Sequence, residues 1–195
     1  MSDLPTLRKQ LKQARAAIDA DSRMHASCRI IRRLERHPRY LKARRIAVYI
    51  GSNHEVDPIP LVHRSPDLDK TFYLPVLHPF RHGRLLFCRW APGHSLKRNR
   101  FGILEPIPSR DNILPVQHLD LLVMPLLGFD RTLNRLGMGG GFYDRSLAFR
   151  TRRTIATRPA LLGLAFEVQR VDHLEKQPWD INVDAIITEA NVYER

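Results

Sequence analysis

The sequence predicts an α/β protein, folded as a single three-layer α/β/α domain over residues 1–195 with a mostly parallel central sheet. Several strand-like segments, such as Leu119–Pro125, are almost uniformly apolar, as strands buried on both faces usually are. Helical patterns alternate with these segments, which is typical of a sheet covered by helices on both sides. With 195 residues, no internal repeat and no low-complexity linker, the chain fits one domain.

Two amphipathic helices are expected at the start of the chain. The apolar positions of the first follow a three-four spacing and are Leu4, Leu7, Leu11, Ala14 and Ile18. Its other sides carry the basic residues Arg8, Lys9, Lys12 and Arg15. The second helix is expected from about Asp21, an acceptable N-cap, and should end before His37-Pro38, because the residue before a proline disfavours helical geometry.

The strand candidates come later and are short runs of aliphatic, β-branched and aromatic residues. They cover residues 45–50, 71–76, 84–90, 119–125, 160–166 and 184–188. A further helix is expected from about Gly141 to Arg150, directly after a glycine-rich turn. Strands that alternate with helices in this way favour parallel strand pairing.

The composition excludes several classes of protein. No stretch approaches the roughly 20 apolar residues of a membrane-spanning helix, and the N-terminus lacks the apolar core of a secretory signal. Cys28 and Cys88 have no partners at metal-ligand spacing, so neither a disulfide framework nor a zinc site is expected. We therefore expect a cytoplasmic protein.

The net charge of +12 leaves a nucleic-acid partner open. Against it, the Lys and Arg residues are spread along the chain, and no helix-turn-helix, zinc-finger or RNP pattern is present. The same charge also suits a solvated surface, or a surface that attracts polyanionic small molecules such as nucleotides. Nucleic acid is therefore not the expected main partner.

The segment Gly137–Gly141 contains four glycines in five residues, between a predicted strand and a predicted helix. Glycine lets the backbone approach a ligand closely, and amides at a helix N-terminus attract anions. The segment lacks both the Gly-Lys-Ser/Thr ending of a P-loop and the spacing of a dinucleotide fingerprint. It therefore predicts an anion site of unspecified kind.

Each of three carboxylates near predicted turns allows two interpretations, a ligand-binding role and a structural role. Asp144 follows the glycines by three residues, where it can hold a magnesium ion or simply stabilise the first turn of a helix. Asp184, at the start of the last strand, has the same ambiguity. Glu55 follows a strand, where α/β sheets place ligands, although a solvated turn residue is the default reading.

Taken together, the segments resemble the 5-formyltetrahydrofolate cyclo-ligase family. Residues 135–145 read Arg-Leu-Gly-Met-Gly-Gly-Gly-Phe-Tyr-Asp-Arg, against the family pattern Arg-Leu-Gly-x-Gly-x-Gly-Tyr-Tyr-Asp-Arg. The preceding Pro125–Asp130 matches the family's Pro-x-x-x-Phe-Asp. Leu7-Arg8 and residues 74–76, 101–106 and 179–181 also resemble bacterial members, so the resemblance spans nearly the whole chain.

The resemblance implies ATP-dependent, magnesium-dependent closure of 5-formyltetrahydrofolate to 5,10-methenyltetrahydrofolate, with ADP and phosphate released. ATP would phosphorylate the formyl oxygen and the folate's own N10 would attack. The implied catalytic residues are Arg135 and Asp144, and the implied magnesium ligands are Asp144 and Asp184. The implied ATP contacts are Arg8, Arg135, Gly137, Met138, Gly139, Gly140, Gly141, Phe142 and Tyr143. The implied folate contacts are Ile50, Glu55 and Met138 to Phe142.

Two departures from the family pattern and two alternatives remain. Leu4 stands where the family commonly has Lys, for which Lys9 or Lys12 would have to compensate, and Phe142 replaces the more usual Tyr. One alternative is a non-catalytic nucleotide- or folate-binding module, and the other is an RNA-associated protein. Because Asp144 and Asp184 are both present, we expect a catalytic monomer whose partners are 5-formyltetrahydrofolate and ATP.

Overall fold

The computed structural model describes residues 3–52, 54–64, 69–152 and 158–194. It contains an eight-stranded sheet with the strand order β12-β11-β10-β7-β1-β2-β3-β6. Five adjacent strands are parallel: β11 (Ala185–Ile187), β10 (Ala160–Leu164), β7 (Leu121–Pro125), β1 (Arg45–Ala47) and β2 (Thr71–Leu77). The antiparallel strands lie at the two edges and are β12 (Val192–Glu194), β3 (Leu85–Arg89) and β6 (Ile113–Leu114).

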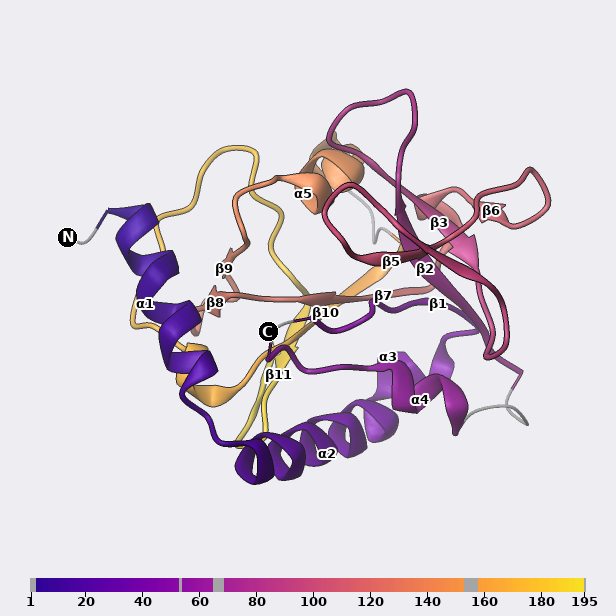
Figure 1. The fold of residues 1–195 in the computed structure, drawn as a ribbon. Helices are drawn as coiled ribbons and strands as arrows, with labels where there is room; N and C mark the ends of the chain where they lie inside the picture. The colour runs from indigo at the N-terminus through magenta and orange to yellow at the C-terminus, as the bar shows by residue number, and fades with distance from the viewer. Residues whose placement is uncertain (1–2, 53, 65–68, 153–157, 195) are drawn as a thin grey trace.

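Side chains of the parallel strands alternate between two apolar cores, one on each face of the sheet. In β7, Leu121 and Val123 face one core and Leu122 and Met124 face the other. The first core is covered by α2 (Ala20–Arg36), α3 (Pro38–Lys42) and α4 (Ile59–His63), and the second by α5 (Phe142–Leu147). Figure 1 shows α2 to α4 below the sheet and α5 above it. The predicted α/β fold with a mostly parallel sheet is confirmed.

Helix α1 (Leu4–Ala16) packs apart from both sheet cores. It contributes Leu7 and Leu11 to a small cluster with Leu127, Leu136, Val171 and Leu174. Figure 1 shows α1 beside the short hairpin of β8 (Gly128–Phe129) and β9 (Arg135–Leu136). The predicted apolar stripe is only partly buried, because Leu4 is 38% exposed. Arg15, which was assigned to another side of the helix than this stripe, is only 4% exposed.

The remaining elements are short and connect the sheet to its loops. They are the hairpin β4 (Leu96–Arg98) and β5 (Leu104–Pro106), with the 3₁₀ turns η1 (Val116–His118), η2 (Ala148–Arg152) and η3 (Glu167–Gln169).

The N-cap of α2 is Asp19 and not the expected Asp21, because the Asp19 carboxylate accepts from the Ser22 amide at 2.8 Å. Across the ranges that the structure describes, no helix is both long and apolar enough to cross a bilayer.

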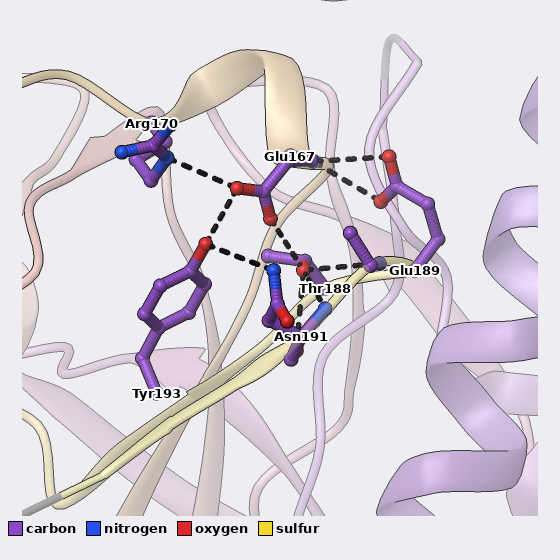
Figure 2. A network of polar contacts seen from close by, with 7 residues as sticks. Glu167, Arg170, Thr188, Glu189, Asn191 and Tyr193 are labelled. Carbon is purple, nitrogen blue, oxygen red and sulfur yellow. Dashed lines mark hydrogen bonds and ion pairs between the residues drawn. The ribbon is translucent and has the colours of Figure 1, made fainter.

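A polar network centred on Glu167 joins η3 to the C-terminal strands (Figure 2). The Glu167 carboxylate accepts hydrogen bonds from Arg170 at 3.0 Å, Thr188 at 2.7 Å and Tyr193 at 2.5 Å. The Glu189 carboxylate in turn accepts from the Glu167 amide at 3.0 Å. Burial alone would raise the pKa of Glu167, but these hydrogen bonds outweigh it and lower the pKa below the usual range. The network therefore stabilises the C-terminal edge only while Glu167 is ionised.

Glu167→Gln should lower the free energy of unfolding at neutral pH by about 1–3 kcal/mol, because hydrogen bonds to a charged acceptor are replaced by weaker ones. A lowered folded-state pKa stabilises the fold above the normal Glu pKa, and this contribution disappears as the pH falls through the folded-state value. The difference between native protein and variant should therefore shrink on acidification, which urea unfolding at several pH values would measure. A pH-independent difference, or an equal loss in the exposed control Glu175→Gln, would contradict this role.

Candidate functional site

The hairpin β8–β9 holds Arg135 at the entrance to the glycine turn, and Asp130 fixes this hairpin. The buried Asp130 carboxylate accepts from the Thr132 amide and hydroxyl at 2.9 and 2.7 Å, from the Asn134 amide and side chain at 3.1 and 2.9 Å, and from the Leu174 amide at 3.0 Å. Burial would raise the pKa of Asp130, but these donors outweigh it and lower the pKa. The carboxylate therefore stays ionised and locks the turn that leads to Arg135.

The glycine turn, defined here as Gly137–Gly141, presents unused amides beside a guanidinium. Gly139 and Gly141 have φ values of 95° and 61°, in the region that favours glycine. Within the described part of the chain, no amide of this turn donates a hydrogen bond to a protein acceptor. Arg8 of α1 donates from Nε to the Gly137 carbonyl at 3.1 Å. Free amides beside a fixed cation are the groups that an anion site needs, and the anion site expected from the sequence stays a prediction.

Arg135 and Asp144 meet across the turn. Arg135 Nη2 forms an ion pair with Asp144 Oδ1, and Arg135 Nε donates to the Ile181 carbonyl at 3.0 Å. The Ile181 amide donates to the same Asp144 oxygen at 3.3 Å. The side chains are 6% and 19% exposed, so the pair is largely desolvated. The backbone of Ile181 therefore holds both charged side chains, its carbonyl binding Arg135 and its amide binding Asp144.

Asp184 forms its hydrogen bonds with other residues than Asp144 does. Its Oδ2 accepts from the Leu161 amide at 2.7 Å, and both of its oxygens accept from Arg150 Nη2, at 3.3 and 3.4 Å. The structure thus gives Asp144 and Asp184 separate hydrogen-bond partners. Among the residues that the structure describes, no group of three or more His, Cys, Asp or Glu side chains is placed to hold a metal ion.

Glu55 is paired with Arg15, the buried arginine of α1. Arg15 Nη1 lies 3.2 Å from Glu55 Oε1, with side chains 5% and 12% exposed. The other oxygen of Glu55 accepts from the Ser52 amide at 3.1 Å and its hydroxyl at 3.0 Å. Ile50, just before this loop, is half-buried and packs against the core. Glu55 is therefore an oriented acceptor and not a solvated turn residue.

Two tyrosines lie close to the Glu55 carboxylate. The buried Tyr49 donates from its hydroxyl to the Val56 carbonyl at 2.6 Å. Burial raises the pKa of Tyr49 and of Tyr143, and the negative charge of Glu55 raises both further. The loop after β1 and the start of α5 therefore share one electrostatic environment, in which both hydroxyls remain protonated.

Phe142 forms an aromatic wall at the other end of the turn. Its ring packs edge-on against Phe101 with centroids 5.8 Å apart, and the Arg145 guanidinium lies 5.9 Å from its centroid. Arg145 also donates to the Gly140 carbonyl and, at 3.0 Å, to the Gly83 carbonyl. Arg145 thus ties the turn to the β2–β3 loop. Met138, in contrast, is 56% exposed.

Sequence reasoning missed Arg15, Tyr49 and Arg145 as parts of this site. A signal existed for Arg15, because it follows Arg8 by seven residues and Leu11 lies between them on the same helix face. An arginine at a core-facing position of a helix needs a buried acid, and Glu55 is that acid. Arg145 is the last residue of the family pattern but was given no role there, and no local pattern indicated Tyr49.

Comparisons with known proteins lead to a single family. A model of the 5-formyltetrahydrofolate cyclo-ligase family matches residues 1–189. The chain is 36% identical to the 5-formyltetrahydrofolate cyclo-ligase of Escherichia coli strain K12 over 184 residues, 94% of this chain and 99% of that protein. It is 36% identical to the Haemophilus influenzae enzyme of that name over 175 residues, 90% and 91% of the two chains. The NMR structure of Aquifex aeolicus 5,10-methenyltetrahydrofolate synthetase superposes with a TM-score of 0.81 at 28% identity, covering 98% of this chain and 92% of that chain.

Proposed function

The chain belongs to the 5-formyltetrahydrofolate cyclo-ligase family, and from this premise we propose that it closes 5-formyltetrahydrofolate to 5,10-methenyltetrahydrofolate at the expense of ATP. The supporting observation is the set of contacts among separate segments. Arg8 of α1 contacts the glycine turn at Gly137, and Arg135 of β9 pairs with Asp144 just after the turn. Arg15 of the same helix α1 pairs with Glu55 in the loop after β1. The turn amides, Arg8 and Arg135 suit phosphates. Glu55 and Phe142 suit a polar heterocycle.

The proposed reaction needs no nucleophile from the protein. The formyl oxygen attacks the γ-phosphorus of ATP, the bond to the bridging oxygen breaks, and ADP leaves. The lone pair of N10 then attacks the formyl carbon, its proton is lost, and the bond from carbon to the phosphorylated oxygen breaks to release phosphate. Phosphoryl transfer of this kind depends on positioning and charge neutralisation more than on side-chain acid-base chemistry.

The residues around the turn can meet these two demands. The amides of Gly137–Gly141 and the guanidinium of Arg8 would bind the phosphates, and Arg135 would neutralise the charge that develops during transfer. The Arg135–Asp144 pair is already fixed against Ile181, so little reorganisation is needed when the substrate binds. Glu55 would accept hydrogen bonds from the pterin, and Ile50 and the ring of Phe142 would provide its apolar contacts.

Magnesium would enter this site with ATP. Asp144 fits a magnesium ligand, because this ion is commonly held by one or two carboxylates with phosphates and waters, and Asp144 lies beside the turn. Asp184 does not fit in its present contacts, since both of its oxygens accept hydrogen bonds from Leu161 and Arg150. When bound, magnesium would neutralise charge on the phosphate oxygens.

The direct test mixes the purified protein with 5-formyltetrahydrofolate, ATP and magnesium and follows the absorbance of the methenyl product. We expect product formation with ADP released in equal amount. Reactions without ATP, or with an ATP analogue that cannot transfer its γ-phosphoryl group, should give no product. Absence of an ATP-dependent signal would refute the proposed activity, and tight binding of both ligands without turnover would identify a non-catalytic module.

Arg15→Met should raise KM for 5-formyltetrahydrofolate by about tenfold and leave KM for ATP almost unchanged, because truncation leaves the buried Glu55 charge without its partner. Arg15→Lys should restore part of the loss, since it keeps the charge but not the fork of the guanidinium. Lys12→Met, on the exposed side of the same helix, is the matched control. Equal changes in both KM values, or a loss of folded protein alone, would indicate a purely structural pair.

A further inference from the structure

Arg145 of α5 connects the glycine turn to the loop between β2 and β3, residues 78–84. It donates hydrogen bonds in two directions, from Nη2 to the Gly140 carbonyl and from Nε to the Gly83 carbonyl at 3.0 Å. In the part of the chain that the structure describes, the bond to Gly83 is the one hydrogen bond between residues 78–84 and a residue outside the β2–β3 hairpin. The position of this loop therefore depends on a side chain that also holds the glycine turn.

The glycines beside Arg145 leave the space that its guanidinium occupies. A Cβ added to Gly83 would collide with Arg145 Nε, and one added to Gly141 would lie 2.9 Å from Nη1. Both glycines also have positive φ values, 74° and 61°. A larger residue at either position would displace the guanidinium, so the backbone on both sides is shaped around this one side chain.

The loop that Arg145 holds forms one wall of the proposed site. Residues of the loop and Phe142 line a common cleft of about 400 Å³, and the Arg145 guanidinium lies 5.9 Å from the centroid of the Phe142 ring. The proposed function places the phosphates of ATP on the turn amides and the folate against Phe142. Because Arg145 donates to two backbone carbonyls, it is placed to position the surfaces for both ligands and not to contact the reacting atoms.

Resting on the proposed function, we infer that Arg145 is a positioning residue that couples the binding of ATP to the binding of 5-formyltetrahydrofolate. Phosphates on the turn amides would fix the Gly140 carbonyl, which holds Arg145 and, through it, the carbonyl of Gly83. The ligand that binds first thus orders the turn and the loop together, and the second ligand meets a site that is already ordered. Since such coupling is reciprocal, each ligand raises the affinity for the other by the same factor.

Equilibrium binding measures this coupling without turnover. Titration calorimetry in magnesium buffer gives the Kd of 5-formyltetrahydrofolate with and without saturating β,γ-imido-ATP. We expect the analogue to lower the native Kd by about tenfold, within the usual range of coupling between two sites. In Arg145→Met this factor should fall below about twofold, while the Kd of each ligand alone stays within about threefold of native, because Arg145 contacts neither ligand. Arg145 is exposed, so its replacement should leave the fold intact.

Two further arginine variants separate positioning from a general loss of structure. Arg145→Lys keeps a cation that can bond one carbonyl but lacks the fork that spans both, so it should keep part of the coupling. Arg23→Met is the matched control, because Arg23 donates to a backbone carbonyl, that of Ile18, at 2.9 Å. It lies in α2, on the opposite side of the sheet from α5 (Figure 1), and its replacement should keep the native factor.

A glycine pair tests the same connection from the loop side. Gly83→Ala displaces the guanidinium while Arg145 itself is retained, so it should lose the coupling as Arg145→Met does. Gly93→Ala introduces a Cβ at a φ of 91° with no atom within 4 Å, and it should keep the coupling. Equal coupling in the two alanine variants would contradict the inference.

The other outcomes are distinguishable from one another. Absence of coupling in the native protein, or native coupling in Arg145→Met, would refute the positioning role and leave the proposed activity intact. A large loss of affinity for one ligand alone in Arg145→Met would make Arg145 a direct contact of that ligand and would also refute the inference. Failure of either ligand to bind the native protein would refute the proposed function itself, and the coupling with it.

Discussion

Asp144→Asn should lower kcat/KM for the ATP-dependent cyclisation by on the order of 10³-fold, in the range seen when a single charge-stabilising group is removed from a phosphoryl-transfer or oxyanion site. The amide keeps the shape of the carboxylate and its acceptor toward the Ile181 amide, but it removes the charge that holds Arg135. It also removes the proposed magnesium ligand. Steady-state kinetics over a range of magnesium concentrations would measure both losses.

The controls separate this loss of chemistry from a loss of folding. Asp172→Asn removes an equal charge at an exposed position and should leave kcat/KM within a few-fold of native. Asp184→Asn should mainly lower the thermal midpoint, because Asp184 supports Leu161 and Arg150. Near-native activity of Asp144→Asn at all magnesium concentrations would contradict the role given to Asp144.

Gly139→Ala is the second substitution from which we expect a large effect, a loss of about 100-fold in kcat. With φ at 95°, any side chain strains the backbone, and the new Cβ would lie 3.7 Å from the guanidinium carbon of Arg8. Relief of this strain moves the turn amides away from the positions that the phosphates require. Single-turnover kinetics with saturating ATP would measure the change in the chemical step.

The chain offers a matched control for this substitution. Gly93 has φ at 91°, and a Cβ added there meets no atom within 4 Å. Both alanine variants should therefore lose about 1–3 kcal/mol of unfolding free energy from backbone strain. Only Gly139→Ala should lose activity, and comparable activity in the two variants would show that the conformation of Gly139 does not matter for catalysis.

The fold was largely predictable because its strands are apolar on both faces. The expected segments 71–76, 84–90 and 119–125 correspond to β2, β3 and β7, with ends shifted by one or two residues. The short hairpins β4–β5 and β8–β9 were not predicted, since pairs of two or three residues leave no periodic pattern. Their stability comes from tertiary contacts such as those of Asp130.

The residue patterns alone indicated the candidate site only where its residues are neighbours in sequence, and Arg8, which contacts Gly137, came from the family resemblance. The glycine turn, Arg135 and Asp144 lie within ten residues, and the structure keeps them together. The partnership of Arg15 with Glu55 joins residues 40 positions apart, which charge patterning along one helix does not reveal. Asp184 has the residue type of a metal ligand, but its contacts with Leu161 and Arg150 depend on strand pairing that the sequence does not display.

The separate anchoring of α1 has a consequence for how the site assembles in solution. Because α1 rests on a small cluster around Leu11 and not on the sheet cores, it should open by local unfolding at a lower free energy than β7 or β10. Amide hydrogen exchange should therefore be faster in α1 than in those strands. Ligands that engage Arg8 or Arg15 bind only the closed state, so ATP should slow exchange throughout the helix. The N-terminal helix would then be the part of the molecule whose order depends on substrate.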